Sequence, residues 1–147
     1  GEASGDEFAS ADLAAKGAYV LADSPTGAVD VILIGTGSEV QLAVAAREQL
    51  AEQGIGARVV SAPSLEWFAE QDDAYRESVL PASVKARVSV EAGLAMPWRG
   101  IVGDAGRSVS IEHFGASADY KTLFQKFGIT TEAVVTAAHE TIAAAGA

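Results

Sequence analysis

The 147-residue sequence contains no cysteine and only two histidines. The lack of cysteine excludes a disulfide framework and a thiolate metal site, and it favours a reducing compartment. We therefore expect a cytoplasmic protein. No group of His, Asp and Glu residues has the spacing of metal ligands, so we predict no metal site in this chain.

Basic residues are also scarce, because ten Lys and Arg stand against twenty Asp and Glu, for a formal net charge of -10. This charge would repel nucleic acid and anionic membrane surfaces. No apolar run approaches the roughly 20 residues that a membrane span needs. We therefore expect neither nucleic acid nor a membrane as a partner.

Hydrophobic residues are plentiful, at 49% of the chain, which suits one compact domain with its own core. Residues 1–11 are small and acidic, and we interpret them as the frayed remnant of a linker. The domain is then expected to occupy residues 12–147.

The order of apolar patterns predicts an α/β fold. The run from Val29 to Ile34 is typical of a strand that is buried on both faces of a parallel sheet. The short turn at 24–27 implies that the strand before it pairs antiparallel with this one. The prediction is a three-layer α/β/α domain with an open, five-stranded, mostly parallel sheet and one antiparallel edge strand. The expected strands are 17–21, 29–34, 57–61, 84–91 and 109–114. We expect Gly54 to end the first helix, Asp72 or Asp73 and Thr130 or Thr131 to cap later helices, and a further helix at about 120–127.

The most informative segment is the glycine turn after this buried strand. In open parallel sheets, ligands usually lie beyond the carboxyl ends of the strands, and the start of a helix there can hold an anion. Glu91 and His113 are expected at the ends of the fourth and fifth strands, near the same edge. The candidate ligand or anion site comprises Gly35, Thr36, Gly37, Ser38, Glu39, Glu91 and His113.

Other features of the turn favour a structural corner. Val40 stands where the dinucleotide fingerprint has its third glycine. Ser38 and Gln41 have the pattern of a capping box, which would use the first N–H groups of the helix internally. Glu39 lies in the first helical turn, where its carboxylate would repel an anion. The self-capped corner is the favoured interpretation, and the ligand site is the alternative.

No catalytic set is apparent, and we predict no catalytic residue in this chain. The Gly-x-Ser-x-Gly motif of a nucleophile elbow is absent. His139 shares a helical stripe with Val135 and Ile142, which is typical of a partly buried core or interface histidine. Glu91 is interpreted as a structural acid that accepts hydrogen bonds. Arg47 is expected outside the apolar stripe of its helix.

Several motifs together resemble the C-terminal domain of transketolase, from about Gly17 to the end of the sequence. Each motif is weak alone, but their order and spacing are specific. The motifs are Gly35–Val40, Pro63–Phe68 with Gln71, Tyr75 and Val79–Pro81, Val90–Gly93 with Trp98, His113–Ala118, and Phe127–Glu132 with Val134.

The resemblance implies a transferase of the pentose phosphate pathway. Such an enzyme moves a two-carbon ketol unit between sugar phosphates, with thiamine diphosphate and a divalent metal, Mg²⁺ or Ca²⁺, in a homodimer. The family's cofactor motif belongs to preceding domains and begins Gly-Asp-Gly, whereas here Gly103-Asp104 is followed by Ala105. We therefore expect no cofactor in this chain.

The resemblance also implies that the partners are the preceding domains of the same enzyme and a second subunit. One hypothesis is an assembly domain that stabilises the dimer and is inactive alone. The alternative is a regulatory module that binds a small anion or a nucleotide at the turn from Gly35 to Glu39, because a shared fold does not establish function.

Overall fold

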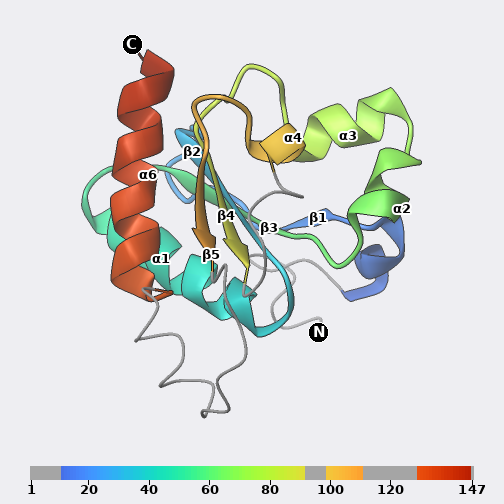
Figure 1. The fold of residues 1–147 in the computed structure, drawn as a ribbon, viewed down its shortest axis with the longest axis horizontal. Coiled ribbons are helices and arrows are strands. Elements are labelled where there is room, and N and C mark those ends of the chain that lie inside the picture. Colours follow the sequence, from blue (N-terminus) through green and yellow to red (C-terminus); the bar gives the residue numbers. More distant parts are fainter. Residues whose placement is uncertain (1–10, 92–98, 111–128, 147) are drawn as a thin grey trace.

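The computed structural model describes residues 11–91, 99–110 and 129–146 (Figure 1). At its centre lies a five-stranded sheet in the order β1-β3-β2-β4-β5. Strands β2 to β5 are parallel, and β1 is antiparallel to β3. The predicted fold class is therefore confirmed. The strands are β1 (Tyr19–Ala22), β2 (Val31–Gly35), β3 (Ala57–Ser61), β4 (Arg87–Glu91) and β5 (Arg107–Ser110).

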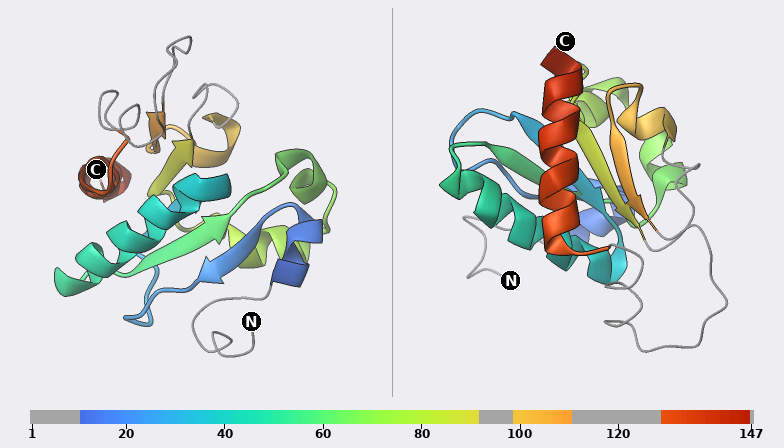
Figure 2. Two further views of the ribbon diagram at one scale, coloured as in Figure 1. Left: turned by 90° about the horizontal axis from the view of Figure 1, so that it is seen from below. Right: turned by 60° about the vertical axis from the view of Figure 1, so that its left-hand side comes forward.

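Helices cover both faces of this sheet (Figure 2). Helices α1 (Val40–Glu52) and α6 (Thr131–Gly146) pack against each other on one face. The opposite face carries several short helices. These are η2 (Ala11–Lys16), α2 (Leu65–Ala69), α3 (Asp73–Val79) and α4 (Arg99–Val102).

Strand β2 is the most deeply buried element of the sheet, as its sequence predicts. Val31 and Leu33 pack under α1 and α6, whereas Ile32 and Ile34 pack against the layer of short helices. All four side chains have 0% exposure. Burial of each contributes roughly 1.5–3 kcal/mol, so this strand anchors both apolar layers.

Strand β1 is the antiparallel edge strand, as expected, but its neighbour is β3 and not β2. The pairing predicted from the short turn was wrong. Strand β2 has β3 on one side and β4 on the other, so β2 has no free edge, and β1 pairs with the outer edge of β3. In the connecting loop, the hydroxyls of Ser24 and Thr26 both donate to the carbonyl of Ala28.

Three predicted helix boundaries are confirmed by local geometry. Gly54, with φ of 78°, follows the end of α1. The Asp72 side chain accepts a hydrogen bond from the Tyr75 N–H at 2.8 Å and caps α3. The Thr130 hydroxyl accepts from the Ala133 N–H at 3.1 Å before α6.

Other expectations were wrong. Arg47 is 4% exposed, because its Nε reaches the carbonyl oxygen of Asp23 at 2.9 Å and its Nη1 pairs with Glu48. His139 is exposed on α6, so its predicted place in the core was wrong, whereas its alternative place at an interface stays a prediction. Strand β4 starts at Arg87, later than predicted, and α4 was not predicted. The predicted helix at 120–127 and most of the strand at 109–114 lie outside the described residues.

Candidate functional site

The candidate site lies at the carboxyl edge of the central strands. Strands β2 and β4 are parallel neighbours, with Gly35 opposite Val90. The residues that follow Gly35 therefore reach the same edge as Glu91, the last residue of β4. The parallel topology therefore brings together two parts of the predicted site, the turn after Gly35 and the end of β4 at Glu91.

Thr36 and Glu91 are joined by a hydrogen bond, in which the Thr36 hydroxyl donates to Glu91 Oε2 at 2.9 Å. Both residues are half-buried. Glu91 is therefore an acid with a hydrogen-bond partner, in agreement with its structural interpretation. This contact links the ends of two strands that are 55 residues apart in sequence.

Gly35 allows the strand and the following helix to pack closely. A Cβ atom added at Gly35 would lie 3.2 Å from the Cα and 3.3 Å from the backbone nitrogen of Val40. Val40 is the residue that replaces the third glycine of the dinucleotide fingerprint. The close approach between the end of β2 and the start of α1 thus depends on Gly35, so α1 can begin with the branched residue Val40.

The start of α1 differs from the predicted capping box. The residues Gly37–Glu39 form a 3-10 turn, and Glu39, not Ser38, is the N-cap residue. Glu39 has helical backbone angles and its carboxylate makes no cap hydrogen bond, while its N–H donates to the Thr36 carbonyl at 3.1 Å. The 3-10 turn extends the helix backward by backbone bonding, so the prediction that Ser38 is the N-cap residue was wrong.

Glu39 itself is 6% exposed and interacts with other residues of the domain. A buried carboxylate at the start of a helix disfavours a second negative group there. Gly37 has φ of 56°, and a Cβ atom at this residue would meet nothing within 4 Å. The open side of the turn is thus at Gly37, whereas the Glu39 side is filled.

His113 lies outside the described residues, as does Trp98. Among the residues that the structure describes, no three His, Cys, Asp or Glu side chains are arranged to hold a metal ion. No helix in the described ranges is long and apolar enough to cross a membrane.

Among the described residues, three groups have a shifted pKa. Burial alone would raise the pKa of Asp23, but the Arg58 guanidinium, which hydrogen-bonds to it at 2.9 Å, brings the pKa below its ordinary value. Burial raises the pKa of Tyr75, whose hydroxyl donates to the Ala18 carbonyl. Burial also lowers the pKa of Arg87, against the effect of the Glu77 charge.

The sequence reasoning missed the role of Arg87, which is half-buried at the start of β4. Its guanidinium donates to backbone carbonyls of three segments. The acceptors are Val84, Ile101, Leu80 and Pro81. The signal available in the sequence was a basic residue within an alternating apolar strand. The carbonyl acceptors of Arg87 lie on other segments, whose positions depend on the tertiary fold.

The topology of the sheet defines an open, mostly parallel α/β domain. Comparison with known proteins identifies the family. The model of the transketolase-like TK C-terminal domain matches residues 17–130, which is most of the sequence. The chain belongs to this family.

Relatives show how much of a longer protein the chain represents. The transketolase of Mycobacterium leprae is 58% identical over 131 residues, which cover 87% of this chain and 19% of the relative. The chloroplastic transketolase of Craterostigma plantagineum is 54% identical over 128 residues, or 86% of this chain and 25% of the relative.

Solved structures agree with this relation. Transketolase from Leishmania mexicana aligns with a TM-score of 0.81 at 39% identity, over 90% of this chain and 19% of that one. The Pichia stipitis transketolase in complex with sedoheptulose-7-phosphate aligns with a TM-score of 0.79 at 37% identity, over 93% and 19%. The chain therefore spans about a fifth of the length of these proteins.

Proposed function

We propose that this chain is the C-terminal domain of a transketolase and that it stabilises the assembly of that enzyme. The observation that carries the proposal is the family match over residues 17–130, within relatives of which only 19% is covered. The transfer of a two-carbon ketol unit between sugar phosphates is then performed by the whole enzyme. The preceding domains and a second subunit are the proposed partners, and the cytoplasm is the proposed location.

The contacts at the carboxyl edge support a structural role for this domain. The Thr36 hydroxyl is engaged by Glu91, and Glu39 is buried among other residues of the domain. Trp67 on α2, at 54% exposure, is the exposed large hydrophobic side chain among the described residues. Tryptophan is enriched at the energetically important positions of interfaces, which supports a role in contacts with other domains.

Thiamine diphosphate and a divalent metal belong, in this proposal, to the other domains. The carboxyl edge does not fit a diphosphate, because the turn there carries the carboxylates of Glu39 and Glu91 and no basic side chain. A metal-bound diphosphate would also need several oxygen ligands, and the described residues offer no such cluster. We therefore assign no step of the reaction to this domain.

The proposal is tested by comparing the purified 147-residue protein with the complete enzyme. Calorimetric titration with thiamine diphosphate and Mg²⁺ is expected to show binding to the complete enzyme and none to the isolated domain. A coupled assay of ketol transfer is expected to show no turnover by the isolated domain. Turnover by the isolated domain would refute the proposed division of roles.

The regulatory anion site at the Gly35–Glu39 turn stays a prediction. Its open side is at Gly37, so titration with nucleotides and sugar phosphates should be followed at the amides of Gly37 and Ser38. Saturable shifts at these amides would support the alternative. If a broad panel of anions leaves both amides unchanged, the alternative is discarded.

A further inference from the structure

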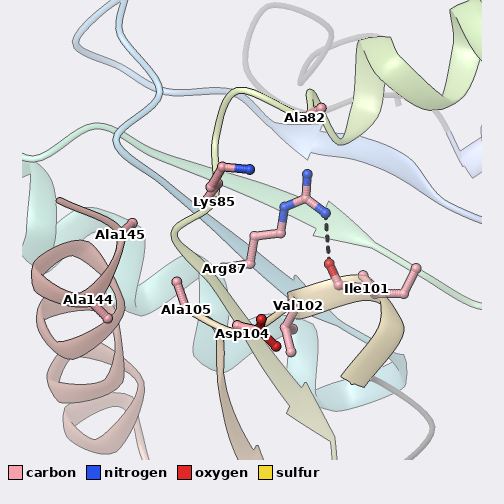
Figure 3. A pocket seen from close by; sticks show the side chains of 10 residues that line it. Ala82, Lys85, Arg87, Ile101, Val102, Asp104, Ala105, Ala144 and Ala145 are labelled. Carbon is pink, nitrogen blue, oxygen red and sulfur yellow. Dashed lines mark hydrogen bonds between the residues drawn. The ribbon is translucent and has the colours of Figure 1, made fainter. Parts of the chain in front are cut away.

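A pocket lies at the end of the sheet opposite the carboxyl edge, near the first residues of β4 and β5. Its volume is about 490 Å³, which is within the range of small-molecule sites. One wall is formed by the end of α6, and another by α4 and the turn after it (Figure 3). The lining residues used below are Lys85, Arg87, Ile101, Val102, Asp104 and Ala145.

Arg87 brings a positive charge to this pocket. Its Nε, Nη1 and Nη2 atoms donate to carbonyl oxygens, of which Ile101 is the nearest at 2.7 Å. Within the described part of the sequence, Arg87 forms no ion pair. Carbonyl dipoles stabilise the guanidinium but do not cancel its charge, and the Glu77 charge offsets only part of it.

Lys85 adds a second positive charge to the same pocket. Its side chain is exposed and has no hydrogen bond or ion pair among the described residues. In Figure 3 the side chains of Lys85 and Arg87 both extend from the start of β4 away from α6. Two unpaired cations lining one hollow attract an anion, in contrast to the net charge of -10 on the whole protein.

The other walls limit which anion fits. Ile101, Val102 and Ala145 present aliphatic surface to the pocket. Asp104 is an exposed acid at its rim, and it would oppose a ligand of high negative charge. The pocket thus combines two cations, an apolar wall and one carboxylate. This lining favours a ligand with one negative charge and a short apolar part.

We propose that this pocket binds a small organic monoanion. Its carboxylate group is bound by Lys85 and attracted by the charge of Arg87, and its short aliphatic part packs against Ile101, Val102 and Ala145. This site is separate from the carboxyl edge, and it does not depend on the ketol-transfer proposal.

Butyrate is the probe for a test on the ¹⁵N-labelled 147-residue protein. Butyrate is expected to give saturable shifts at the amides of Val102, Gly103 and Ala145. The variant Lys85→Gln should weaken the apparent affinity about tenfold, the usual effect of losing a charge-assisted hydrogen bond. The variant Asp104→Asn should strengthen it, because a repelling carboxylate is removed.

Lys16→Gln is the charge control, since it removes the same charge from an exposed lysine on η2, outside the pocket. It also removes a cation–π contact with Tyr75 at 4.9 Å, so its melting temperature should fall slightly. It should leave butyrate affinity unchanged, and cooperative thermal unfolding should show that all three variants are folded. Equal weakening by Lys16→Gln and Lys85→Gln would overturn the proposal, because it would show a general charge effect.

Acetate and inorganic phosphate are the comparison ligands. Acetate should bind several-fold more weakly than butyrate, because it lacks the methylene groups that contact the apolar wall. Phosphate should bind more weakly than butyrate, because of Asp104 and the missing apolar part. The proposal is overturned if butyrate gives no saturable shift at tens of millimolar, or if either comparison ligand binds as tightly.

Discussion

Thr141 joins three parts of the fold through one buried hydroxyl. Its exposure is 0%, and its Oγ1 donates to the Ala105 carbonyl at 2.5 Å and accepts from the Arg87 N–H at 3.2 Å. Helix α6 is thereby tied to the start of β4 and to the turn before β5. The substitution Thr141→Val keeps the shape of the side chain and removes both hydrogen bonds.

The expected loss follows from these two contacts. A hydrogen bond contributes a net of about 0.5–1.5 kcal/mol, and a buried polar group left without a partner costs about 1–3 kcal/mol. Thr141→Val leaves one backbone N–H and one backbone carbonyl without these partners. We therefore expect the free energy of unfolding to fall by about 2–4 kcal/mol.

Urea denaturation followed by far-UV circular dichroism measures this difference, provided that the transition is two-state and its m-value is unchanged. The matched control is Thr136→Val, an exposed position of the same helix, which should change stability by less than about 0.5 kcal/mol. Equal stability of the two variants would refute the reasoning, because it would mean that the two hydrogen bonds of the Thr141 hydroxyl do not stabilise the fold.

Two further predictions concern the glycine turn and the pH dependence of stability. Gly35→Ala should lower the free energy of unfolding by about 1–2 kcal/mol, because the new Cβ would lie 3.2 Å from the Val40 Cα. Urea denaturation measures this loss, and unchanged stability would contradict the close packing. The folded-state pKa of Asp23 is below its ordinary value of 3.8 because of Arg58, so its stabilising effect is present above pH 3.8 and is lost as pH falls through the folded pKa. Asp23→Asn should therefore reduce the loss of stability on acidification, by a small amount because the carboxyl is exposed; an unchanged loss would contradict the role of the Arg58 pair.

The features that the sequence predicts well depend on local chemistry. The apolar run of β2 requires burial on both faces, wherever the strand lies in the sheet. Gly54, Asp72 and Thr130 end or begin helices through contacts within a few residues. These three short-range predictions were confirmed, whereas Ser38 was wrongly predicted as the N-cap residue of α1.

The features that were missed depend on distant contacts. The neighbour of β1 is decided by which edge of the sheet stays open, and a turn length does not reveal this. Arg47 is buried because the carbonyl of Asp23 lies within its reach, 24 residues away in sequence. At the candidate site, the position of Glu91 at the end of a strand was predictable, but its bond to Thr36 required knowledge that β2 and β4 are neighbours.

The central claim is that this domain stabilises the enzyme's assembly while the chemistry takes place in other domains. The most direct measurement is sedimentation velocity of the complete transketolase beside a truncated form that lacks residues 12–147. We predict that the complete enzyme sediments as a dimer and that the truncated form dissociates to monomers at the same protein concentration. A truncated enzyme that stays dimeric with unchanged affinity between its subunits would contradict the account.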